Sequence, residues 1–497
     1  MSFKLAVIGA GSVGFTRKLL SDILTVPEFH NMQVSFTDIN DHNLQMVAQL
    51  CQRDINSNGL SIKINSTLDR REAVTGARYI INCARIGMLE AFETDINIPL
   101  KYGIDQCVGD TLCAGGIMYG QRGVAAMLDF CRDIREVSEP GALLLNYGNP
   151  NAMLTWAANK YGGVNTLGLC HGVQGGHRQI AEALGYRQDE VDIICAGLNH
   201  QTWYISVKHN GEDLIPKILP AYEANPDLSE TEKTRIDVMR NFGYYSTESN
   251  GHLSEYLMWY RKKPDDLKNW ICLNEWINGE TGGYLRVCRE GRNWFEEDFP
   301  NWMKAEPVKF VPGNRSQEHG SYIIEGLETG RVYRGHFNVM NNGAITNLPY
   351  ECVVEVPGYA DGNGISIPKV GELPLGCAAI CSQSVWVQRL AVEAAVKGDI
   401  TLLRQAMLMD PLTGAVCNPQ EIRQLVDEML VAQAEWLPQY QEEIERAKTR
   451  LANGPLIPPK DYTGIRLAEK SVEEMRQNAE DARRNAAEAD KAKKGRG

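Results

Sequence analysis

The chain has 497 residues, of which 43% are hydrophobic, and its formal net charge is −12. This size indicates a large core organised in two or three domain-sized units. A negative balance argues against a nucleic-acid partner, because phosphate binding needs clustered Lys and Arg. The sequence has no run of about 18 apolar residues and no signal-peptide pattern after Met1, so we expect no membrane partner and a cytoplasmic location.

The 13 cysteines are expected to be thiols, because their number is odd and no export signal is present. Five of them lie in apolar segments and are predicted to be small core residues: Cys51, Cys131, Cys195, Cys352 and Cys381. No C-x-x-C pair occurs, so a structural zinc knuckle is not expected.

Strand-like and helix-like segments alternate through the first 170 residues. The predicted strands are 4–8, 33–37, 79–82, 142–146 and 166–170. Amphipathic helices are predicted over 15–24 and 41–57. This alternation predicts an α/β protein with a doubly wound, Rossmann-type parallel sheet. Ligands of such sheets bind at the carboxyl ends of the strands.

A glycine-rich turn follows the first predicted strand and opens the first helix. It contains Gly9, Gly11, Ser12 and Gly14 in the G-x-G-x-x-G pattern, where missing side chains let the backbone approach a pyrophosphate at a helix N-terminus. Asp38 ends the second strand, where an acid binds a ribose diol and repels a 2′-phosphate. We therefore predict NAD rather than NADP. The alternative is a tight turn without a ligand.

The pattern changes near residue 191, where an α+β region begins. It contains predicted strands at 191–195 and 202–207, a Trp-rich charged stretch at 264–307, a strand-and-turn region at 343–364 and a long helix at 378–397. We expect three units: 1–190 for NAD, 191–465 for substrate, metal and oligomerisation, and 466–497 as a charged tail. The tail has almost no large apolar residue after Met475, so it is predicted to be an unanchored helix that frays.

Two short polar segments at strand ends offer a thiol and an imidazole. Cys170 and His200 are 30 residues apart, which suits two neighbouring strand ends and excludes a shared helix. Two protein ligands bind a divalent metal weakly and leave positions for water or substrate hydroxyls, which favours a catalytic over a structural metal. The alternatives are a buried thiol and a core histidine.

Several motifs together resemble glycoside hydrolase family 4, the NAD-dependent glycosidases, from Met1 to about Pro459. Besides the glycine-rich turn they are 109–111 with 115–117, 146–150, 170–173, 197–200, and 347–349 with 353–356. The resemblance implies that Cys170 and His200 bind manganese or another divalent metal and that Asn149 contacts the sugar. It also implies a lactate/malate dehydrogenase-like fold.

The resemblance implies a redox mechanism outside the two-carboxylate scheme of most glycosidases. NAD+ takes hydride from C3 of the sugar, and the metal stabilises the enediolate that forms when a base removes the C2 proton. The aglycone leaves by elimination, water adds at C1, and NADH restores C3. The cofactor is regenerated in each cycle.

The motifs identify the residues that transfer protons less directly than they identify the metal ligands. His171, beside Cys170, is the candidate near the leaving oxygen, although it can equally hydrogen-bond substrate. The segment that matches the base of the family lacks the usual Asp or Tyr, so His252 is the candidate, with Tyr256 behind it. Asp110 either orients a substrate hydroxyl or a metal-bound water, or caps a helix. Cys113 is expected to fill space.

Within the family the chain resembles the α-galactosidase branch, which includes Glu248, Glu255 and Tyr256. We therefore predict an exo-acting α-glycosidase that cleaves an unphosphorylated glycoside. Gly172 replaces a Ser common in that branch, and Cys-His-Gly is similar to α-glucuronidases. A uronate carboxylate needs a positioned arginine, for which Arg85, Arg122 and Arg178 are available, and we assign Arg85 to substrate binding.

Two other classes stay open at this point. An NAD-dependent 2-hydroxy acid or sugar dehydrogenase shares the doubly wound sheet but predicts net NADH and does not need Cys170. A non-catalytic NAD-binding regulator keeps the glycine turn without the metal ligands. The apolar helix at 378–396 is suited to a homo-oligomer, a dimer or tetramer.

Overall fold

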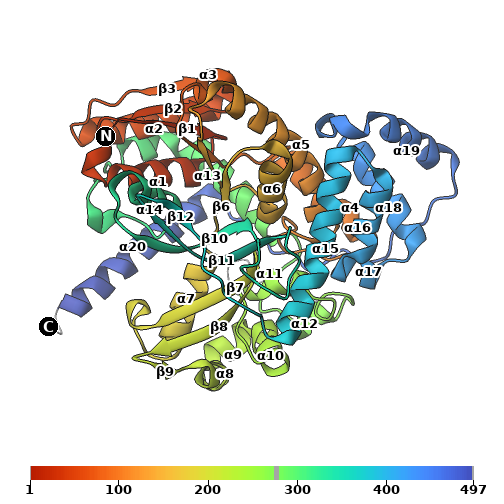
Figure 1. The fold of residues 1–497 in the computed structure, drawn as a ribbon. Helices are drawn as coiled ribbons and strands as arrows, with labels where there is room; N and C mark the ends of the chain where they lie inside the picture. The colour runs from red at the N-terminus through yellow and green to blue at the C-terminus, as the bar shows by residue number, and fades with distance from the viewer. Residues whose placement is uncertain (1, 274–278, 495–497) are drawn as a thin grey trace.

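The computed structural model describes residues 2–273 and 279–494, and within them one mixed sheet of 12 strands spans the molecule (Figure 1). The order is β3-β2-β1-β4-β5-β6-β10-β11-β7-β8-β9, with β12 beside β11. The strands are β1 Lys4–Ile8, β2 Gln33–Thr37, β3 Ile64–Thr67, β4 Tyr79–Asn82, β5 Leu143–Asn146, β6 Thr166–Gly168, β7 Asp192–Leu198, β8 Gln201–His209, β9 Glu212–Asp213, β10 Tyr333–Met340, β11 Val353–Asp361 and β12 Gly364–Ser366.

Strands β1 to β6 are parallel and form the doubly wound part of the sheet. Their connecting helices include α1 Val13–Leu24, α2 Asp41–Ser57, α3 Arg70–Val74, α4 Met88–Lys101, α5 Cys113–Val137 and α6 Asn151–Ala157. Helix α1 packs on α2, and α5 packs on α3 and α6. The α/β prediction is confirmed, and the predicted strands 4–8, 33–37 and 79–82 have the expected bounds.

Antiparallel strands extend the same sheet beyond β6. Strand β10 pairs with β6 and β11, β11 pairs with β7, and β7 and β8 form a hairpin. Strand β10 was not predicted, because its glycine and polar positions weaken the strand pattern and its pairing with β6 and β11 defines it. Strand β6 ends at Gly168, so Cys170 lies in the loop that follows it.

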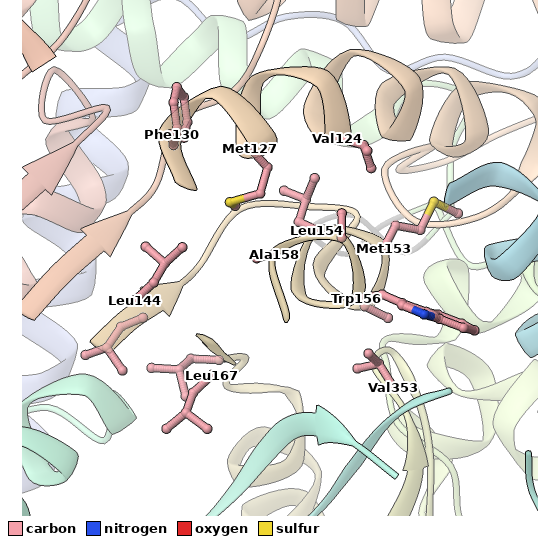
Figure 2. Packing of buried hydrophobic residues seen from close by; sticks show 14 of the residues in the cluster. Val124, Met127, Phe130, Leu144, Met153, Leu154, Trp156, Ala158, Leu167 and Val353 are labelled. Atoms are coloured by element: carbon pink, nitrogen blue, oxygen red, sulfur yellow. The ribbon is translucent and has the colours of Figure 1, made fainter. Parts of the chain in front are cut away.

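The hydrophobic core joins both halves of the chain (Figure 2). Side chains of α5, α6, the turn that follows α6, and strands β5, β6 and β11 pack together there: Val124, Met127, Phe130, Leu144, Met153, Leu154, Trp156, Ala158, Leu167 and Val353. All are buried, and removing such apolar surface from water stabilises the fold by about 25 cal/mol per Å². The five cysteines predicted to be core residues are also buried, and all 13 are free thiols.

The second half is mainly helical beyond its strands. Its longer helices are α7 Gly172–Ala183, α8 Ile215–Ala224, α10 Lys233–Phe242, α13 Gly283–Lys304, α14 His319–Thr329, α15 Leu375–Lys397, α16 Ile400–Met409, α18 Pro419–Ala432, α19 Gln441–Asn453 and α20 Val472–Lys494. No helix in the described part of the chain is long and apolar enough for a membrane span. Part of the predicted stretch 264–307, residues 274–278, lies outside the described residues.

The charged tail differs from the expectation that nothing anchors it. Helix α20 packs along α13, and Arg476 Nη2 donates to Asp298 Oδ1 at 2.8 Å. The amide of Lys470 donates to Glu290 Oε1 at 2.9 Å. These anchors are polar, so the scarcity of large apolar residues in the tail gives no sign of them.

Candidate active site

The glycine-rich turn lies between β1 and α1 and contacts the end of β2. Gly9 has a left-handed φ of 80°, and a Cβ there would lie 2.5 Å from the backbone nitrogen of Ala84, so only glycine fits. The Gly11 amide donates to Asp38 Oδ2 at 2.8 Å, and the Asn40 amide donates to Oδ1 at 2.9 Å. These bonds fix the carboxylate of Asp38 at the strand end.

The other two fingerprint positions have different surroundings. Ser12 is the N-cap residue of α1. Gly14 is exposed, and a Cβ there would meet no atom within 4 Å. Close packing of the helix against the strand therefore does not require a glycine at this third position.

His200 occupies the two-residue turn of the β7–β8 hairpin, where Leu198 pairs with Gln201. Its φ of 62° is left-handed, a conformation that two-residue hairpin turns use and that costs a non-glycine residue energy. Thr111 Oγ1 donates to Asp110 Oδ1 at 2.8 Å and lies 2.8 Å from His200 Nδ1. Because that hydroxyl hydrogen is used, Nδ1–H of His200 must donate to Thr111, which leaves the Nε2 lone pair free for a metal.

Cys170 and Glu248 meet His200 at this hairpin. One donor atom from each of the three residues lies within 4.8 Å of the other two. Oε1 of Glu248 is shielded from solvent and has no hydrogen-bond partner among the described residues. A soft sulfur, an imidazole and an unpaired carboxylate oxygen fit a divalent metal with mixed ligands. Burial raises the pKa of the Cys170 thiol well above its usual value, so a bound cation is what would favour the thiolate.

Asp110 forms the centre of a second, closed cluster. Asn149 Nδ2 donates to its Oδ2 at 2.7 Å, and His252 Nε2 lies 3.3 Å from its Oδ1. Although burial opposes ionisation, these contacts with His252 keep the pKa of Asp110 well below its usual range. Asp110 caps no helix, because α5 begins after the N-cap residue Leu112. It therefore belongs to the polar site.

His252 links the two clusters. Its Nδ1 lies 3.9 Å from Glu248 Oε2, and its Nε2 contacts the hydroxyl of Tyr256. Burial lowers the pKa of His252, but the carboxylates of Asp110 and Glu248 outweigh burial and raise the pKa to about 10. In this geometry the His252 ring lies between the carboxylates of Asp110 and Glu248.

Glu255 positions the loop that carries Asp110. Its carboxylate accepts from the amides of Cys107, of Val108 at 2.8 Å and of Gly109 at 3.4 Å. Cys113 is fully buried, and its thiol donates to the backbone oxygen of Glu255 at 3.3 Å. The space-filling interpretation of Cys113 agrees with this position.

The three candidate arginines lie in different environments. Arg122 is buried and pairs through both terminal nitrogens with Asp95, at 2.9 and 2.7 Å, so it is a structural residue. Arg178 is exposed. Arg85 lies over the rings of Phe92 and Tyr119, 4.4 and 5.1 Å from their centroids, and no described carboxylate forms an ion pair with it. Neither Arg85 nor Arg178 has a carboxylate partner among the described residues, but of the three only Arg85 combines this lack with a place over aromatic rings.

The structure brings most predicted residues together: Asp110, Asn149, Cys170, His200, His252 and Tyr256. His171 is apart from this network, because its side chain is 66% exposed and its Nδ1 lies 3.7 Å from Glu318 Oε1. Thr111, Glu248 and Glu255 also belong to the site, although no role was predicted for them. Two signals were available: Thr111 belongs to the 109–111 motif, and Glu248 precedes His252 by four residues.

Fold and site together define an α/β enzyme in which a dinucleotide-type turn and a candidate metal cluster both follow the ends of sheet strands. Comparison with the sequence models of known protein families identifies the class of enzyme. The sequence model of the Family 4 glycosyl hydrolase matches residues 4–186, and that of the Family 4 glycosyl hydrolase C-terminal domain matches residues 195–413. The chain belongs to glycosyl hydrolase family 4, as the resemblance predicted.

Individual relatives cover nearly the whole chain. It is 55% identical to an alpha-galactosidase of Rhizobium meliloti (strain 1021), over 98% of this chain and 99% of the relative. It is 34% identical to an alpha-galactosidase of Bacillus subtilis (strain 168), over 88% and 99%. A solved structure of the 6-phospho-beta glucosidase from Thermotoga maritima, with manganese, NAD+ and glucose-6-phosphate, aligns with a TM-score of 0.72 and 25% identity, over 87% of this chain and 99% of that one.

Proposed function

We propose that this protein is an exo-acting α-galactosidase that cleaves an unphosphorylated α-galactoside with NAD and a divalent metal. Manganese is the first candidate for that metal. The observation that carries the proposal is the cluster of Cys170, His200 and Glu248 beside the Asp110–Asn149 pair. The two alpha-galactosidase relatives support the sugar, and the structure with manganese and NAD+ supports the cofactors.

The turn of Gly9, Gly11, Ser12 and Gly14 is assigned to the NAD pyrophosphate. The N-terminus of α1 supplies positive partial charge there. Asp38 is assigned to the ribose diol, and its two amide hydrogen bonds hold a fixed negative charge that repels a 2′-phosphate.

Cys170 and His200 are assigned to the metal, and Asn149 to the sugar. When bound, NAD supplies a reversible hydride acceptor, and the metal supplies Lewis acidity to neighbouring sugar oxygens. Thr111 holds the His200 ring in the tautomer that ligation requires. Asp110 holds the Asn149 amide, which leaves the amide oxygen of Asn149 free to accept a sugar hydroxyl.

The His252–Tyr256 pair is assigned to proton transfer at C2, because the two side chains touch and both lie beside the metal cluster. Asp110 and Glu248 orient His252 from opposite ring nitrogens. His171 is assigned to the leaving oxygen; its exposed side chain lies next to Cys170 and has room to approach an aglycone.

A uronate substrate is the second candidate, and Arg85 is the observation that favours it. Its guanidinium is enclosed by aromatic rings and lacks a carboxylate partner among the described residues. A substrate carboxylate is a bidentate partner for such a group. For either sugar, Arg85 is assigned to substrate binding.

We also propose a cytoplasmic homo-oligomer, a dimer or tetramer, without nucleic-acid or membrane partners. Thirteen free thiols support a cytoplasmic location, because thiols stay reduced in the cytosol. The exposed Trp386 and Leu375 on α15 support an apolar contact between copies. The division into 1–190, 191–465 and 466–497 is retained, with the NAD turn in the first unit and His200 in the second.

The test is nitrophenol release from α-galactoside, α-glucuronide and α-glucoside substrates under reducing conditions, with NAD+ and Mn2+ each added or omitted. We expect α-galactoside cleavage that needs both additions and accumulates no NADH. Preference for the glucuronide would select the second candidate. Failure on every glycoside, with NADH formed from a free sugar or hydroxy acid, would indicate a dehydrogenase.

A further inference from the structure

Two clusters of possible metal ligands share His200, and their hydrogen bonding distinguishes them. In the cluster of Asp110, His200 and His252, both oxygens of Asp110 already accept bonds and His252 lies between two carboxylates. In the cluster of Cys170, His200 and Glu248, the Glu248 Oε1 atom is shielded from solvent and has no donor among the described residues. A buried carboxylate oxygen without a partner is costly unless a cation satisfies it.

The backbone holds Glu248 in this place. The preceding residue, Thr247, donates its amide to the carbonyl oxygen of Thr202 at 3.0 Å, and its hydroxyl lies 2.7 Å from the Thr202 hydroxyl. Thr202 belongs to β8, two residues after His200. These hydrogen bonds therefore hold the segment that carries Glu248 against the hairpin that carries His200.

Gly172 supplies the space that the carboxylate occupies. A Cβ on Gly172 would overlap Glu248 Oε1 and would lie 3.6 Å from Cys170 Sγ. Gly172 opens helix α7 without a left-handed backbone, and alanine is the better helix former, so conformation alone gives no reason for glycine. The missing side chain is explained by the contact with Glu248.

We infer that Glu248 is a third protein ligand of the divalent metal and that Gly172 is the positioning residue that lets its carboxylate reach Cys170 and His200. The inference rests on the proposed function, which places the metal on those two residues. A carboxylate adds a hard, charged ligand to a thiolate and an imidazole, and it suits Mn2+ better than the two softer ligands alone. Three protein ligands still leave coordination positions for sugar oxygens.

The test measures Mn2+ binding alone, without NAD or sugar, by electron paramagnetic resonance of free Mn2+ in reducing buffer. Glu248→Gln keeps the size of the side chain and removes its charge, and we expect its Kd for Mn2+ to rise at least about tenfold. Gly172→Ala is expected to raise the Kd similarly because it displaces the carboxylate. Gly175→Ala is the matched control in the same helix, since a Cβ there meets no atom within 4 Å.

A double variant tests whether Gly172 acts through Glu248. Gly172→Ala with Glu248→Ala is expected to have the same Kd as Glu248→Ala alone, because the overlap no longer exists. Additive losses would overturn the positioning role of Gly172. Thermal unfolding shows whether each variant is folded. If Gly172→Ala does not fold, the Kd of the isosteric Glu248→Gln variant still tests whether Glu248 is a ligand.

The Cys170→Ser variant separates this inference from the proposed function. If Cys170→Ser raises the Kd and Glu248→Gln leaves it unchanged, the third-ligand assignment is overturned while the proposed metal site stands. If wild-type protein does not bind Mn2+, or Cys170→Ser binds it equally well, the proposed metal site itself fails. With Co2+ in place of Mn2+, Glu248→Gln should keep the thiolate charge-transfer absorption, because Cys170 still binds.

Discussion

Thr111 Oγ1 lies 2.8 Å from His200 Nδ1, a contact between residues 89 positions apart in the chain. Because the Thr111 hydroxyl donates to Asp110, it accepts from the imidazole and fixes the tautomer of His200. We expect Thr111→Val to weaken Mn2+ binding by about 10- to 100-fold. Thr111→Ser keeps the hydroxyl and should retain affinity. Equal Mn2+ affinities of the Val variant and the wild type, measured by titration, would contradict the role of this contact.

Asp38 is expected to select the cofactor. Asp38→Ser removes a charge that two backbone amides hold in place, so the KM for NAD should rise about tenfold, which corresponds to the loss of about 1.4 kcal/mol of binding. Discrimination against NADP should fall as well. Steady-state kinetics with both cofactors measure the ratio. Asp41→Ser, at an exposed position at the start of helix α2, is the control and should leave the ratio unchanged.

Tyr256 and His252 are expected to share the C2 proton transfer. Tyr256→Phe keeps the buried ring and removes the hydroxyl that contacts His252. Exchange of the C2 proton of the sugar with D2O, followed by nuclear magnetic resonance, should fall by about 100-fold or more. Mn2+ affinity is the control and should stay within a few-fold of wild type. Undiminished exchange in Tyr256→Phe would remove Tyr256 from the proton-transfer step.

Arg122 is expected to stabilise the fold rather than to bind substrate. Arg122→Met leaves the buried carboxylate of Asp95 without its paired cation, and such a change costs about 3–5 kcal/mol of unfolding free energy. Urea unfolding measures the loss. The double variant with Asp95→Leu removes both charges and should recover most of the stability. A wild-type unfolding curve for Arg122→Met would show that the pair is not structural.

His336 is expected to make the fold sensitive to acid. Burial lowers the pKa of His336 from 6.5 to about 3, and its Nε2 has no hydrogen-bond partner among the described residues. Between these two values the unfolded chain binds a proton that the folded chain does not. Stability is therefore retained above pH 6.5 and falls as the pH drops, by roughly 1.4 kcal/mol per pH unit for this group.

The measurement is urea unfolding of wild type and His336→Leu at pH 7.5, 6.0 and 5.0. The variant should lose less stability than the wild type as the pH decreases, whatever its stability at pH 7.5. The same dependence on pH in both proteins would assign the acid sensitivity to other groups.

The parallel half of the sheet can be predicted from the amino-acid sequence, because the alternation of apolar strands and amphipathic helices is a local pattern. The β1–turn–α1 unit and helix α2 have nearly the predicted bounds. The motifs also identified the family correctly. Cys170 and His200 were expected at two neighbouring strand ends, but β10 and β11 lie between β6 and β7 in the sheet. The two residues nevertheless meet in the cluster with Glu248.

The residues that complete the site are defined by contacts between distant segments of the chain. Thr111, Glu248 and His200 lie on separate segments, and no periodicity in the sequence reports that these segments converge. The same holds for the arginines, since pairing with Asp95 removes Arg122 from the candidates while Arg85 remains without a carboxylate. Strand β10 and the polar anchors of α20 also depend on distant partners. Local patterns follow from neighbouring side chains, whereas these contacts follow from how the whole core packs.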